Sequence, residues 1–180
     1  MLRARRGTFP DTPDDRDALP CEQWPTHIAN YRPIAKHGVR ARERDTRKVT
    51  MKGSVHAVEA IAVSNTDFRQ GLHTAAYCQL VVMALDVHAD IGEEVHMPDR
   101  FSRVERGSGA AVLDDVLTEI TAGFAILIAA GTTHDIINAG DVPMKLSTRY
   151  APPDLRDGVV HRTRADAEAD DEHFDGKTME

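Results

Sequence analysis

This 180-residue chain has only two cysteines, few aromatic residues and no long apolar run. Cys21 and Cys78 do not form a Cys-x-x-Cys pair, which excludes a zinc finger, and Cys78 lies in an apolar segment that favours a core thiol over a disulfide. The longest apolar run, residues 124–130, is far shorter than the ~20 residues that span a bilayer. No apolar stretch follows the N-terminal arginines, so we expect no signal peptide and a cytoplasmic location.

The charge of the chain is unevenly distributed. Residues 1–50 carry 11 Lys or Arg and 7 Asp or Glu, whereas the remainder carries 11 and 22. Such an acidic body lacks the clustered cations that bind nucleic-acid phosphates or an anionic membrane surface, so neither partner is expected. The chain also has no glycine-rich phosphate loop and no serine or cysteine in a nucleophile motif.

Residues 1–50 form a different kind of sequence from the rest. They are rich in Arg, Asp and Pro and show no sustained period of 2 or 3.6, so they cannot bury enough apolar surface to offset their ordering entropy. A disordered leader is the first interpretation. The alternatives are a native start at Met51 and, less well supported by the mixed charge, a functional basic arm.

From residue 55 onward, short β-branched or alternating segments are separated by glycine and aspartate turns, which predicts an all-β sandwich or barrel. No helical period competes between residues 55 and 150, and Phe101 is expected in the core or in the wall of a pocket. The expected strands cover residues 55–63, 77–86, a short segment holding Glu94 and His96, 101–106, 110–113, 116–121, 124–130, 134–139 and 142–150.

The C-terminal segment 163–180 is predicted to be an acidic tail with one short helix. Thr163 and Asp166 have the spacing of a capping box, which predicts a helix from about Arg164 to His173. His161, just before it, is expected at the surface, and the alternative is that it reaches the mouth of the pocket.

Two segments carry the residues that could bind a metal. Glu94 and His96 lie two apart in a β segment, so their side chains point the same way, and His134 follows a glycine turn about forty residues later. Two histidines and one carboxylate that converge from different strands can hold a divalent ion and leave coordination positions open.

These segments resemble the two motifs of the cupin family over roughly residues 51–174. In the second motif Gly123, Gly131, His134 and Asn138 stand at the family's spacing, with Ala129 at its proline position. The resemblance implies a double-stranded β-helix, or jelly-roll barrel, here over residues 51–162, in which the glycines turn, the histidine is a metal ligand and the asparagine is structural. It also makes a homodimer through exposed sheet edges an expectation.

The first motif departs from the family pattern. Counting back from Gly107, His96 takes the second histidine position and Glu94 the first, but Arg100 stands where the family has a ligand glutamate. A guanidinium is always cationic and cannot ligate a metal, so Arg100 either turns outward, with Asp99 supplying a carboxylate, or turns inward and clamps an anionic substrate group.

Two functions follow from the resemblance and these residues. The first is a metalloenzyme, dioxygenase-like or sugar-isomerase-like, that acts on a small polar molecule with Glu94, His96 and His134 holding Fe, Mn, Zn or Ni and Arg100 as substrate clamp. The alternative is a binding protein without catalysis, in which the metal site is degenerate or empty.

Overall fold

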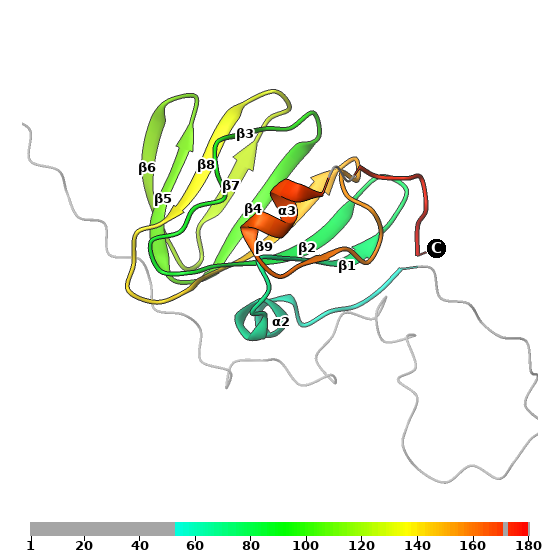
Figure 1. The fold of residues 1–180 in the computed structure, drawn as a ribbon, viewed down its shortest axis with the longest axis horizontal. Helices are drawn as coiled ribbons and strands as arrows, with labels where there is room; N and C mark the ends of the chain where they lie inside the picture. Colours follow the sequence, from blue (N-terminus) through cyan, green and yellow to red (C-terminus); the bar gives the residue numbers. More distant parts are fainter. Residues whose placement is uncertain (1–52, 171–172, 180) are drawn as a thin grey trace, which may run out of the picture. The chain divides into compact units, whose positions relative to one another are not determined.

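The computed structural model describes residues 53–170 and 173–179, all within the unit Val49–Glu180 (Figure 1). The expectations for residues 1–50 and for a start at Met51 therefore lie outside the described residues. Two antiparallel sheets make up the described part, with strand orders β10-β1-β2-β9-β4-β7 and β3-β8-β5-β6. The strands are β1 Arg69–Thr74, β2 Gln79–Leu85, β3 Glu94–Val95, β4 Asp99–Arg106, β5 Ser108–Leu113, β6 Val116–Thr121, β7 Ala125–Ile128, β8 Thr133–Asn138, β9 Met144–Ala151 and β10 Val160–His161.

The expected all-β architecture is confirmed, and the inner faces of the two sheets enclose one core. β2 pairs with both β1 and β9, and its sequence Gln-Leu-Val-Val-Met-Ala-Leu is largely buried on both faces, as its continuous apolar pattern predicts. The core between the sheets includes Val81, Met83, Val104, Ile136 and Leu146.

The N-terminal element of the described part corrects the sequence analysis. Residues 55–63 were expected to form a strand, but Val58–Ser64 form helix α2, which packs on β9, β2 and β4 of the six-stranded sheet (Figure 1). Val58, Ile61 and Ala62 have the i, i+3, i+4 spacing of one helical face, and Glu and Ala favour helix, so the helical pattern was present but too short to stand out. Neither described helix could span a membrane.

Helix α3, Arg164–Ala169, begins at the expected capping box. The Thr163 hydroxyl accepts from the Asp166 backbone N–H at 3.2 Å, and the Asp166 carboxylate accepts from the Thr163 N–H at 2.9 Å. The helix ends at Ala169, earlier than expected. β1 and β10 had no clear sequence signal, and they pair with each other next to this helix.

Three side chains settle or correct the expectations from the sequence. Phe101, expected in the core or in a pocket wall, points outward from β4, is 40% exposed and lines a surface hollow. His161 was expected at the surface and is buried, because its strand β10 pairs with β1. Cys78 is only half-buried, because it precedes β2 rather than lying within it.

The residues of the second motif have the structural roles that the resemblance implied. Gly123 and Gly131 have φ angles of 90° and 81°, the left-handed region that L side chains rarely adopt. The buried Asn138 amide reaches the carbonyl oxygens of Leu85, Asp86 and Val142 at 2.9 to 3.1 Å. These bonds tie the end of β8 to the turns around it.

Candidate metal centre

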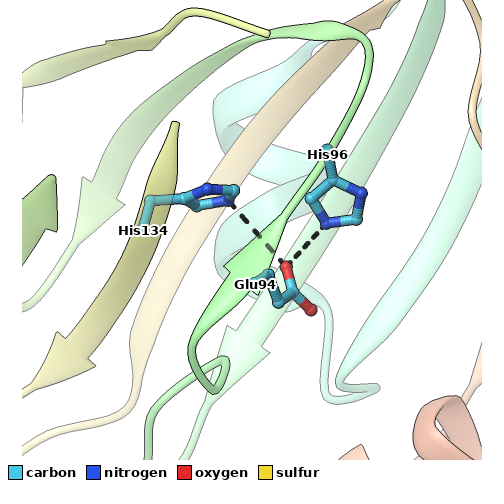
Figure 2. A group of neighbouring side chains, drawn as sticks. All are labelled: Glu94, His96 and His134. Atoms are coloured by element: carbon cyan, nitrogen blue, oxygen red, sulfur yellow. Dashed lines mark hydrogen bonds and ion pairs between the residues drawn. The ribbon is translucent and has the colours of Figure 1, made fainter. Parts of the chain in front are cut away.

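The register of β3 against β8 brings the first and second motifs together. Glu94 is directly opposite His134 in this pair, and His96 follows two residues after Glu94 (Figure 2). The Glu94 Oε2 atom lies 2.9 Å from His96 Nε2 and 4.0 Å from His134 Nε2. One ligand atom from each of the three residues lies within 4.8 Å of the other two. The predicted convergence of one carboxylate and two imidazoles is therefore present.

Each imidazole is anchored through its other ring nitrogen. His96 Nδ1 lies 2.9 Å from the Asp154 carboxylate, and His134 Nδ1 lies 3.0 Å from the Thr132 carbonyl oxygen. Both partners only accept hydrogen bonds, so both Nδ1 atoms carry hydrogen and the Nε2 atoms turn toward Glu94. Metal-binding histidines are characteristically oriented in this way by an acceptor behind the ring.

Arg100 reaches the same point from the facing sheet. Its Nη1 lies 3.1 Å from Glu94 Oε2 and 3.1 Å from His134 Nε2, and its side chain is fully buried. The guanidinium also lies 5.1 Å from the centre of the Tyr150 ring. Of the two orientations left open by the sequence, the structure has the inward one, and Asp99 instead accepts from the Ala130 N–H outside the site.

Glu94 is held as a carboxylate by three donors. Besides His96 and Arg100, the buried Arg69 guanidinium lies 3.5 Å from Glu94 Oε1. Burial alone would raise the pKa of Glu94, but the His96 hydrogen bond and the charges of Arg100 and Arg69 lower it to about 2. An ionised carboxylate is the form that ligates a cation.

The two histidines have opposite electrostatic surroundings. The hydrogen bonds with Asp154 and Glu94 outweigh burial and raise the pKa of His96 to about 9, so both its nitrogens donate. Burial, with the nearby charge of Arg100, lowers the pKa of His134, which is neutral and accepts at Nε2. Arg69 and Asp154 complete this network, and sequence reasoning missed both because neither lies in a motif.

A pocket of about 310 Å³ opens onto the carboxylate side of the cluster. Glu94, His96 and Asp154 line it together with Arg69, and Arg164 and Glu168 of α3 form part of its wall. A larger hollow of about 590 Å³ lies over β5 and β6, but Glu119 is the one ionisable residue in its wall. The smaller pocket has the size and the convergent polar groups of a small-molecule site.

The donor set fits a divalent metal with one complication. Two protein ligands held at about 2.1 Å from one ion lie at most about 4 Å apart, close to the separations observed. Both rings are oriented from behind and the carboxylate is ionised. The complication is Arg100, whose Nη1 uses two of the same ligand atoms.

With this geometry in place, comparison with known proteins is informative. A family model described as a cupin domain matches residues 81–149. The crystal structure of BH2720 from Bacillus halodurans is 37% identical, with a TM-score of 0.65, over 66% of this chain and 96% of that one. The chain belongs to the cupin family.

Two further relatives carry no stated activity. The uncharacterised protein YrkC of Bacillus subtilis is 38% identical over 58% of this chain and 60% of its own length. The uncharacterised protein L612 of Acanthamoeba polyphaga mimivirus is 35% identical over 54% of this chain and 64% of its own length. The chain thus spans less than two thirds of either protein, and neither supplies a substrate.

Proposed function

We propose that this cupin binds a divalent metal through Glu94, His96 and His134 and uses it to bind and transform a small polar organic molecule. The observation that supports this most directly is the orientation of the two imidazoles. Asp154 and the Thr132 carbonyl hold the Nδ1 sides, which turns both Nε2 atoms toward one ionised carboxylate. The 2-His-1-carboxylate set suits ferrous iron, and Mn, Ni or Zn are compatible with it.

A bound ion would supply Lewis-acid or redox chemistry beside a coordinated substrate, as a dioxygenase-like or isomerase-like reaction requires. The chain itself supplies the surroundings of that site. Arg69 adds to the His96 and Arg100 contributions that keep Glu94 ionised, the sheet faces exclude water from His134, and the pocket beside α3 admits a small molecule. Arg100 is positioned to hold an anionic group of that molecule.

A second function is favoured by one specific contact. Because Arg100 Nη1 donates to both Glu94 and His134, the cluster is already neutralised by a cation of the chain itself. In this alternative the barrel binds a small polar ligand and carries out no metal chemistry.

Elemental analysis of full-length protein, purified without a histidine tag, distinguishes the two functions. The metal hypothesis predicts close to one equivalent of Fe, Mn, Ni or Zn, and loss of that metal in His134→Ala. A matched control is His88→Asn, which changes an exposed histidine in a turn whose positive φ asparagine tolerates. Absence of metal from both proteins after loading with each ion would leave the alternative.

The expected homodimer and cytoplasmic location remain predictions. β7 lies at one edge of the six-stranded sheet, and its Leu127 is 74% exposed, so this edge is available for pairing. Light scattering of the purified protein measures the oligomeric state.

A further inference from the structure

We propose that Arg100 competes with the metal from inside the barrel, and that a small carboxylate anion binds the guanidinium which the metal displaces. This inference rests on the proposed function, because it concerns the same three ligands. Its consequence is that metal and carboxylate each strengthen the binding of the other.

The competition follows from the single lone pair on His134 Nε2. His134 Nδ1 faces a carbonyl oxygen and therefore carries hydrogen, and Arg100 has only donors, so Nε2 accepts from Nη1. A neutral imidazole nitrogen has one lone pair. It either accepts from Arg100 or ligates an ion, and it cannot do both. Glu94 Oε2 has enough lone pairs to bind the ion and Arg100 together, so the competition is decided at His134 Nε2.

In its present position the guanidinium is shielded from solvent. The Arg100 side chain is fully buried, its charge lies over the Tyr150 ring and its Nη2 lies 3.5 Å from Met83 Sδ. If a metal takes His134 and Glu94, the guanidinium loses its neutral acceptor and shares the charge of Glu94 with the ion. Burial of an incompletely compensated charge is unfavourable, which favours binding of a new anionic partner.

One donor of Arg100 and one of Tyr150, whose ring the guanidinium faces, lack partners. The Arg100 Nε and the Tyr150 hydroxyl are both buried and, among the described residues, neither has a hydrogen-bond acceptor. A carboxylate offers two oxygens in the planar geometry that a guanidinium binds bidentately. The ligand class that matches these donors is therefore a small organic carboxylate. It would enter from the pocket that Glu94 and His96 line and reach Arg100 behind them.

The test is titration of Co²⁺ into chelator-treated, tag-free, full-length protein, with and without acetate, followed by visible absorption and calorimetry. We expect acetate to tighten Co²⁺ binding about threefold or more in the unmodified protein, since coupled sites are linked reciprocally. In Arg100→Met, Co²⁺ should bind about tenfold tighter without acetate, a change of ~1.4 kcal/mol, and acetate should have no effect. Arg100→Gln serves as a second variant if the methionine variant does not fold.

Arg69→Met is the matched control. It removes one positive charge beside Glu94 but does not touch His134, so it should raise Co²⁺ affinity less than Arg100→Met and keep the acetate effect. The inference is overturned if both Arg100 variants bind Co²⁺ no tighter than the unmodified protein, or if acetate still tightens binding in them. Co²⁺ binding by none of the proteins would instead overturn the proposed function itself.

Discussion

The two histidines of the cluster lie within 5.6 Å of each other, ring centre to ring centre, yet their halves of the site are opposite in character. The outer half, around His96, faces two carboxylates and the pocket. The inner half, around His134, faces a guanidinium and the barrel interior. The same side chain is thus a cation in one half and a neutral acceptor in the other. A metal would replace the proton on His96 Nε2 in the outer half and the Arg100 guanidinium at His134 Nε2 in the inner half.

The largest effect is expected from reversing the charge of the inner half. Arg100→Glu places a carboxylate where the family has a ligand, so metal affinity should rise about 100-fold or more, ~2.7 kcal/mol. Without metal, Glu94 and the new glutamate would repel each other in a buried site, at a cost of roughly 3 kcal/mol of unfolding free energy. Urea unfolding with and without Zn²⁺ measures both changes. An unfolding free energy of the variant that is the same with and without Zn²⁺ would contradict the prediction.

Removing one imidazole at a time should distinguish the outer half of the site from the inner half. His134→Ala and His96→Ala should each weaken metal binding, by more than the roughly 10- to 100-fold typical of losing an outer-shell partner. Both variants should also lose stability in the presence of chelator, but for different reasons. His134→Ala leaves Arg100 Nη1 without its second acceptor, which should cost about 1–3 kcal/mol at any pH between 6.5 and 9. His96→Ala loses ion pairs with Glu94 and Asp154 whose contribution falls over that pH range. A loss in His134→Ala that falls with pH as it does in His96→Ala would argue against the inner contact.

Asp154→Asn tests the orientation of the outer ring. The change removes the largest contribution to the raised pKa of His96 and weakens the hold on its Nδ1. Near pH 8.5 the variant should bind Co²⁺ about tenfold more weakly than the unmodified protein. The difference in Co²⁺ affinity should narrow toward pH 6. At that pH Co²⁺ must displace a proton from His96, and the unmodified protein holds this proton more tightly because Asp154 raises the pKa of His96. A difference independent of pH would assign Asp154 a purely structural role.

A further effect is expected on the pH dependence of stability in the presence of chelator. The folded pKa of His96 is raised to about 9, so its contribution is complete below about pH 6.5 and is lost as pH rises through 9. The folded pKa of Glu94 is lowered to about 2, so its contribution is present above about pH 4.5 and is lost as pH falls toward 2. Unfolding free energy should therefore decline by on the order of 2 kcal/mol between pH 6.5 and 9. In His96→Gln this decline should disappear, and a parallel decline in both proteins would contradict the assignment.

Much of the fold could be predicted because strand and turn signals are local. The β-strands from Gln79 to Ala151 were found within a few residues, as was the capping box of α3. Helix α2 was missed because a seven-residue segment of apolar residues suits a strand or a helix equally well, and packing on the sheet decides between them. The convergence of Glu94, His96 and His134 was predictable from strand alternation and the motif spacing, whereas their role as ligands remains a prediction.

The sequence by itself determined that Glu94 and His96 share a face, because side chains alternate along a strand, and that glycine turns deliver His134 at the start of another strand. Only the tertiary structure decided which residues complete the network. Arg69 and Asp154 come from β1 and from the loop after β9, so no local pattern relates them to the motifs. Whether Arg100 turns outward or inward depends on what lies across the barrel. There the Glu94 carboxylate and the lone pair of His134 Nε2 accept hydrogen bonds from its guanidinium, so it turns inward.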